Sequence, residues 1–306
     1  MTIKHALLPL CLAATLSAGA QKPGAKVAPK PGAFQLKYES FTLPNGLKVI
    51  LHEDHSDPIV AVSTVVHVGS NREKPGKTGF AHFFEHMSFN HSENTPRGAN
   101  RKLIPEWGGN RNGGTWSDGT VYYEVIPKDA FEKILWIDSD RLGFMINTVT
   151  KEALEKEIQV VKNEKRQNYD NVAYGSTSEV ILSNLYPKEH PYNWTVIGSL
   201  PDLQAASLAD VKEFYDRYYG AANATLVIAG DIDPKKTKER VQYWFGEIRR
   251  GPAIQPLKPQ AARLAETRSL SFEDNFARLP EYTMVFPTVE QYHPDSYPLS
   301  ILAQLL

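Results

Sequence analysis

In the first part of the chain, the apolar residues form short continuous runs or alternate with polar residues. Both patterns are typical of β-strands. Residues 47–51 and 59–68 are rich in valine, isoleucine and leucine and are bounded by turn residues, a composition that predicts paired strands of a substantial sheet. Residues 115–126 form a further β-rich segment, and the uninterrupted apolar run 224–230 predicts a buried strand.

Between these segments the apolar period lengthens to that of helices. The expected helices start near Thr78, cover residues 99–107, 129–145, 151–170 and 207–219, and end with one that reaches Phe245. Thr78 and Ser207 stand at two of the starts, where a hydroxyl can cap the first turn. Because helices and strands come mixed without steady βαβ alternation, the pattern favours an α+β fold over a doubly wound parallel sheet.

The texture of the chain changes again near residue 250. Residues 251–267 have the proline-rich, polar composition of an interdomain linker, and beyond them residues 282–286 predict a strand and residues 296–306 an apolar helix. Since that helix meets the end of the sequence, we expect residues 268–306 to begin a second, incomplete α+β domain. We also expect the chain to be the front part of something longer.

Residues 1–20 have the pattern of a cleavable secretory signal. Lys4 precedes an apolar run from Ala6 to Ala18, and small residues lead to a cleavage site near Ala20. The run is too short for a stable membrane span. Residues 21–37 then carry three prolines and four lysines without an acid, which predicts a flexible tether. We therefore expect export to the periplasm or secretion.

Composition narrows the chemistry and the partners. A chain of 306 residues with 42% hydrophobic residues is sufficient for real cores. The single cysteine, Cys11, lies inside the signal segment, so the mature chain would use neither disulfides nor thiolate ligands. The formal net charge is −1, and the near balance of charges argues against nucleic acid or an anionic membrane as the partner.

The most informative motif is His82-Phe83-Phe84-Glu85-His86. On a helix, His82, Glu85 and His86 share one face. The order H-x-x-E-H is the inverzincin arrangement, in which two histidines bind zinc and the glutamate takes the proton of a zinc-bound water. The alternative is a pair of core histidines on a buried amphipathic helix, because the surrounding residues are largely phenylalanine.

A hydrolytic zinc site takes three protein ligands and leaves the fourth position to water. With cysteine excluded, the third ligand must be histidine or a carboxylate on another element. Glu157 and Glu164 are seven residues apart on an expected helix, so they lie two turns apart on nearly one face. The alternative for this pair is a solvent-facing set of charges with the neighbouring lysines.

These motifs together resemble one known family. The H-x-x-E-H helix, Gly108-Gly109, the segment Asn112-Gly113-Gly114-Thr115, Asp118–Tyr123 and the Glu157/Glu164 helix are similar in order and spacing to the catalytic domain of the pitrilysin/insulinase (inverzincin) zinc metallopeptidases. That family includes the mitochondrial processing peptidase and bacterial periplasmic zinc proteases. The resemblance covers about residues 38–250. It implies a metallohydrolase domain of the processing-peptidase type, with a mostly antiparallel sheet packed with helices, followed by the start of a second similar domain.

The resemblance also implies roles for particular residues. One zinc ion would be held by His82, His86 and Glu164, with Glu85 as general base and Glu157 as an assisting acid. The strand beginning at Asn112 would be the edge strand on which a peptide is laid, which gives four expected substrate-binding residues: Asn112, Gly113, Gly114 and Thr115.

The expected function is therefore a zinc-dependent endopeptidase acting on peptides or unfolded segments. Family members enclose the substrate between two halves, so the resemblance further implies a complementary C-terminal half or partner subunit. One alternative is a non-catalytic or partner-dependent subunit of a heteromeric peptidase. Another is an enzyme similar to the S-ribosylhomocysteine lyases, which also use H-x-x-E-H but place a cysteine near the metal; the cysteine-free mature chain weighs against it.

Overall fold

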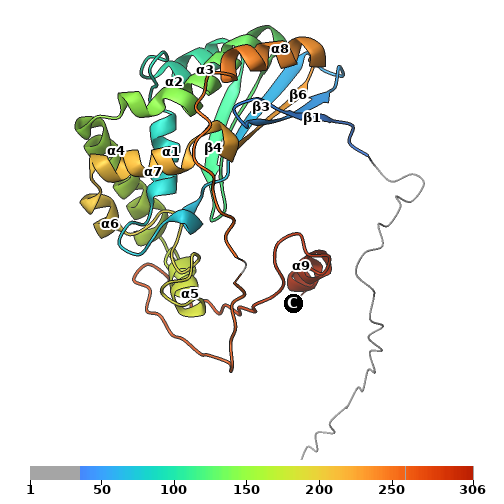
Figure 1. The fold of residues 1–306 in the computed structure, drawn as a ribbon. Coiled ribbons are helices and arrows are strands. Elements are labelled where there is room, and N and C mark those ends of the chain that lie inside the picture. Colours follow the sequence, from blue (N-terminus) through green and yellow to red (C-terminus); the bar gives the residue numbers. More distant parts are fainter. Residues whose placement is uncertain (1–34, 259, 306) are drawn as a thin grey trace, which may run out of the picture. The chain divides into compact units, whose positions relative to one another are not determined.

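The computed structural model describes residues 35–258 and 260–305 and contains one six-stranded sheet in that part of the chain (Figure 1). The expected signal segment, with its cleavage site near Ala20, lies outside the described residues. The strands, in chain order, are β1 (Glu39–Thr42), β2 (Lys48–Glu53), β3 (Ile59–Val66), β4 (Asn110–Thr115), β5 (Thr120–Pro127) and β6 (Ala224–Gly230). Their order across the sheet is β1-β2-β6-β3-β5-β4, which leaves β4 at an edge.

The sheet is mostly antiparallel, since only the β2 and β6 pair runs parallel. β3 alternates strictly between buried and half-buried positions after its first residue, as expected for a strand with one face toward the core. β6 pairs with both β2 and β3. A segment more than 150 residues distant in the sequence thus completes the centre of the sheet.

Most of the helices pack around this sheet, whereas the two that cover residues 177–185 and 296–305 bury none of their residues. The helices are α1 (Phe80–Ser88), α2 (Ala99–Glu106), α3 (Phe131–Phe144), α4 (Lys151–Lys165), α5 (Thr177–Leu185), α6 (Leu200–Ala205), α7 (Leu208–Tyr218), α8 (Pro234–Phe245) and α9 (Ser296–Leu305). α3 and α8 pack together and α1 lies between β4 and α4 (Figure 1). The core lies between the sheet and the apolar stripes of these helices.

The predicted fold class is confirmed by this arrangement. Most expected elements form within a few residues of their predicted bounds, and Ser207 caps α7 in a capping box with Asp210. The expectation for Thr78 was wrong: Gly79, with φ 89°, stands at the start of α1, and the Thr78 hydroxyl donates instead to Asp202. The β-rich segment 115–126 is part of a hairpin, because the turn between Trp116 and Gly119 separates β4 from β5.

The segment after α8 is largely irregular. Residues 251–258 and 260–295 contain no helix or strand, so the strand predicted over 282–286 was wrong. That segment has no partner strand, and Tyr282, Met284 and Phe286 are exposed; an unpaired strand gains neither ladder hydrogen bonds nor a buried face. The helix predicted at 296–306 does form, as α9.

Candidate metal centre

Two imidazoles and a carboxylate meet where α1 packs against α4. The His82 and His86 rings, one turn apart on α1, have centroids 4.6 Å apart. Glu164 of α4 lies opposite them, with its two carboxylate oxygens 3.6 Å from His82 Nε2 and 3.0 Å from His86 Nε2. One ligand atom from each residue lies within 4.8 Å of the others. This is the one metal-binding cluster of His, Cys, Asp and Glu found among the described residues.

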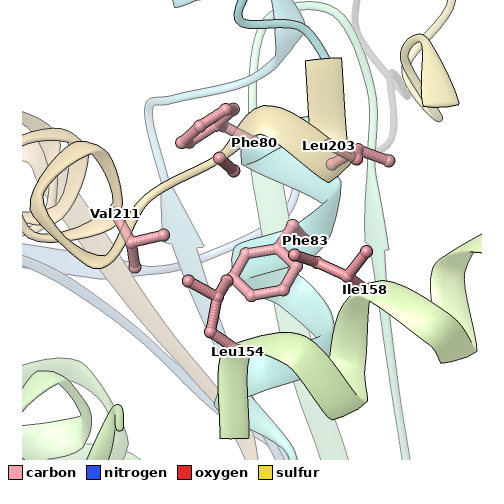
Figure 2. Close-up of a pocket in the computed structure, with 7 residues that line it drawn as sticks. Phe80, Phe83, Leu154, Ile158, Leu203 and Val211 are labelled. Carbon is pink, nitrogen blue, oxygen red and sulfur yellow. The ribbon is translucent and has the colours of Figure 1, made fainter. Parts of the chain in front are cut away.

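The site is positioned by apolar packing between the two helices. Leu154, Ile158 and Val161 form the buried stripe of α4, and Phe83 of α1 lies against the first two of these (Figure 2). A four-residue and then a three-residue step along one helix keeps such side chains on one face. Glu157 and Glu164 flank this stripe and therefore both point toward α1.

The two glutamates contact opposite nitrogens of one imidazole. His86 Nδ1 lies 3.1 Å from a Glu157 oxygen, and the other Glu157 oxygen accepts a hydrogen bond of 2.7 Å from the Asn90 side chain. Glu164 faces Nε2 of the same ring. With Nδ1–H donated to Glu157, Nε2 is the nitrogen left to bind a metal, and the ring orientation is fixed.

The two histidines differ in protonation. Burial, together with the nearby charge of His86, lowers the pKa of His82 to about 4. Burial also opposes the charge on His86, but its hydrogen bonds to Glu157 and Glu164 outweigh that effect and raise its pKa to about 9. At neutral pH the metal-free chain therefore holds a neutral His82 beside a protonated His86.

Metal binding should consequently displace one proton from His86. Between pH 7 and pH 9 the apparent zinc affinity should rise about tenfold per pH unit, and it should level off above the pKa of about 9 because no proton then remains to be displaced. Competition titrations against a chromophoric chelator, corrected for the chelator's own protonation, measure this slope. A pH-independent affinity over that range would contradict the assignment.

Glu85 lies on the same face of α1 and is held from the sheet. The Thr115 hydroxyl donates a hydrogen bond of 2.7 Å to Glu85 Oε2. Burial raises the pKa of the Glu85 carboxyl, against the opposing effect of the Thr115 hydrogen bond. A raised pKa makes the carboxylate a stronger proton acceptor, and the threonine contact leaves the other oxygen, Oε1, free for that task.

Edge strand β4 runs directly beside these groups. Because Trp116 N–H donates to Gly119 across the hairpin, the antiparallel alternation turns the backbone groups of Arg111, Gly113 and Thr115 away from β5. The Gly113 N–H is met there by its neighbour's side-chain oxygen, Asn112 Oδ1, at 2.9 Å. The outward edge of β4 is therefore open to another extended chain.

The cluster meets the requirements of a catalytic zinc site. Two imidazole nitrogens and one carboxylate are a ligand set that zinc uses in hydrolases. His86 already has the outer hydrogen bond that orients such a ligand, because its Nδ1 contacts Glu157, which in turn accepts from Asn90. Within residues 35–258 and 260–305, His82 Nδ1 is buried without a hydrogen-bond partner.

The structure thus brings five predicted residues to one place: His82, Glu85, His86, Glu157 and Glu164. Asn112, Gly113, Gly114 and Thr115 all lie on edge strand β4, and Thr115 also donates to Glu85. Asn90, which donates to Glu157, was missed; it lies in the turn after α1, where the helical period no longer applies. Glu73, which binds the start of α1, carried no signal in the sequence pattern.

Comparison with known proteins identifies the family of the chain. The profile of the family described as insulinase (peptidase family M16) matches residues 48–191, and that of the peptidase M16 inactive domain matches residues 205–306. The zinc protease PqqE of Helicobacter pylori is 31% identical over 214 residues, which cover 70% of this chain and 48% of that protein. The mitochondrial-processing peptidase subunit beta of Saccharomyces cerevisiae is 26% identical, covering 70% of this chain and 46% of that protein.

Solved structures show the same fold. A protease from Helicobacter pylori superposes with a TM-score of 0.67 at 30% identity, covering 75% of this chain and 53% of that one. The first half of the periplasmic protease PqqL from Escherichia coli gives a TM-score of 0.64 at 26% identity, covering 74% of this chain and 49% of that one. The chain belongs to the M16 (insulinase) peptidase family.

Two further facts bear on the whole molecule. The chain spans about half the length of several curated relatives that it matches, including the Helicobacter protein. Within residues 35–258 and 260–305, no helix has both the length and the apolar character needed to cross a membrane.

Proposed function

We propose that this chain is the catalytic part of a zinc-dependent endopeptidase that hydrolyses bonds in peptides or unfolded segments. The observation that supports this function most directly is the convergence of His82, His86 and Glu164, with Glu85 on the same helix face beside edge strand β4. Relatives named zinc proteases and processing peptidases share this family.

The ligand residues and the general base have separate roles in hydrolysis. When bound, zinc supplies Lewis acidity that lowers the pKa of water and polarises a carbonyl. Glu85 Oε1 accepts the proton of the attacking water and then delivers it to the leaving amine, while Thr115 keeps Oε2 in place. Glu157 does not contact the metal itself. Its carboxylate accepts a hydrogen bond from His86 Nδ1–H and so orients this ligand.

The substrate would bind as an added strand on β4. Backbone groups of Arg111, Gly113 and Thr115 face outward, so an extended peptide can pair with them and place its next bond near Glu85. To bind, the peptide must displace the Asn112 side chain from the Gly113 N–H. Most of the affinity for the peptide would then come from its backbone hydrogen bonds. The peptide side chains would add only a limited preference for particular sequences.

Backbone pairing predicts a two-residue period in an N-methyl scan. Methylation of those peptide nitrogens that face β4 should weaken competition for cleavage by about tenfold each, since it removes one hydrogen bond and adds a clash. Methylation of the intervening nitrogens, which point away from β4, provides the matched control. Equal effects at consecutive positions would argue for recognition through side chains.

We also propose a complementary half. The chain spans about half the length of several relatives, and the family profile over residues 205–306 is that of the peptidase M16 inactive domain. We place the catalytic domain at residues 38–250, a linker at 251–267 and the start of a second domain at 268–306. If the catalytic domain ended at residue 205, it would lack β6, which lies between β2 and β3 in the sheet. This supports a domain boundary at residue 250. Export to the periplasm, where the PqqL relative acts by its name, is part of the same proposal.

The function is tested by metal content and cleavage measured separately. The 306-residue chain should bind one zinc ion, yet it should cleave a quenched peptide pool only slowly until the complementary half is supplied. With that half, chelator-sensitive cleavage should appear and should return on adding zinc. Fast turnover by the 306-residue chain would refute the need for a second half, and absence of zinc binding would refute the function itself.

A further inference from the structure

A buried glutamate holds the start of the helix that carries both histidines. Burial raises the pKa of Glu73 to about 8, while the hydrogen bonds that it accepts favour its ionised form. Glu73 is 7% exposed, and its two oxygens accept hydrogen bonds from the N–H groups of Gly79 at 2.9 Å and Ala81 at 2.8 Å. Trp194 Nε1 donates to the same carboxylate at 3.1 Å. α1 has no capping side chain of its own, because Gly79 stands at its cap. Glu73 therefore meets N–H groups that a helix otherwise leaves without partners.

A second carboxylate fixes the residue just before. Asp202 accepts from both the backbone N–H and the hydroxyl of Thr78, at 3.0 and 2.7 Å, and that hydroxyl accepts from Ser199 N–H at 3.0 Å. Gly198 lies so close that a Cβ added there would be 2.4 Å from Gly79 N. Hydrogen bonds to Glu73 and to Asp202 thus fix the start of α1.

The rest of α1 is held mainly by apolar contact. Figure 2 shows Phe80 and Phe83 in a pocket shared with Leu154 and Ile158 of α4 and Leu203 of α6. Apolar packing of this kind is not directional, so it resists separation of the helices more than sliding between them. One residue of a helix corresponds to about 1.5 Å along its axis. A slide of that size would be large against the 3.0 and 3.6 Å that separate the imidazoles from Glu164.

We infer that Glu73 is a positioning residue of the metal site: by accepting from Gly79 and Ala81 it fixes the axial position of α1, and so places His82 and His86 opposite Glu164. His82 follows Ala81 directly, so the hydrogen bond and the first ligand are one residue apart. The inference rests on the proposed metal site and adds a determinant outside it.

The test is the Glu73→Gln variant, which keeps the shape of the side chain but replaces one acceptor oxygen by a donor. We expect its zinc affinity, measured by competition with a chelator, to fall by about tenfold. The visible absorption spectrum of the cobalt-loaded chain should also change, because it reports ligand geometry. Asp233→Asn is the matched control: Asp233 accepts from Lys236 N–H at the start of α8, a helix with no residue in the site, so its affinity and spectrum should stay at wild-type values.

The outcomes are distinguishable. If the wild-type chain binds no metal, the proposed function fails before Glu73 is tested. If wild type binds and Glu73→Gln matches it in affinity and spectrum, or if Asp233→Asn loses as much, the positioning role is overturned. Should circular dichroism show Glu73→Gln to be unfolded, Trp194→Phe decides instead, since it removes one donor to the carboxylate. A severalfold loss with an altered cobalt spectrum would support the role, and wild-type values would overturn it.

Discussion

Replacing Glu85 by glutamine should abolish peptide hydrolysis while leaving zinc in place. Glutamine keeps the shape of the side chain and can still accept from Thr115, but it cannot take a proton from water at neutral pH. In whichever form of the protein cleaves peptides, with or without its complementary half, kcat should fall by about 10²–10⁴-fold. Quenched-peptide turnover and zinc content measured on the same sample check both halves of the expectation.

A nearby substitution provides the control for this variant. Thr115→Val removes the hydroxyl that holds Glu85 Oε2 but leaves the base itself, so its loss should be much smaller than that of Glu85→Gln. Normal turnover in Glu85→Gln would show that another group accepts the proton. Loss of zinc together with activity would show that Glu85 is a ligand.

The second large effect is on zinc affinity, and it should differ between the two glutamates of α4. Glu164→Gln should lose tight zinc binding, with affinity lowered more than about 100-fold, because the carboxylate facing both Nε2 atoms is replaced by a neutral amide. Glu157→Gln should bind zinc about 10–100-fold more weakly than wild type but still in a 1:1 ratio, since Glu157 contacts only the far nitrogen of His86.

Metal analysis after gel filtration, together with chelator competition, measures this difference. The two variants serve as each other's control, because both remove one negative charge from the same helix. Should Glu157→Gln be the variant that loses its metal, the third ligand would have been assigned to the wrong turn of α4.

Local patterns were sufficient to predict the elements that build the site. The spacing of His82, Glu85 and His86 holds on any regular helix, and so does the spacing of Glu157 and Glu164; α1 and α4 are regular through those residues. The closeness of the two helices depends on contacts between residues more than 60 positions apart, which no local period reveals. The resemblance to a known family supplied that information.

The two wrong predictions, the Thr78 cap and the strand over residues 282–286, have a common physical cause. Thr78 has the chemistry of a cap, but its hydroxyl donates to Asp202, and Glu73 accepts instead from the N–H groups at the start of α1. Residues 282–286 have the composition of a strand, but a strand forms only when a neighbour pairs with it. Both cases depend on which distant backbone lies nearby, and composition does not encode that.

The contact of His86 with a carboxylate on each side has a practical consequence for the resting protein. The Glu157 and Glu164 carboxylates lie 3.1 and 3.0 Å from opposite nitrogens of the ring, and the helices that bear the ligands are joined by apolar packing that needs no ion. Small structural zinc domains unfold when stripped of metal, whereas we expect the packing between α1 and α4 to keep this site assembled when zinc is removed. We therefore expect zinc to be removed and restored reversibly, with the zinc supply of the surrounding compartment setting the loaded fraction of the protein.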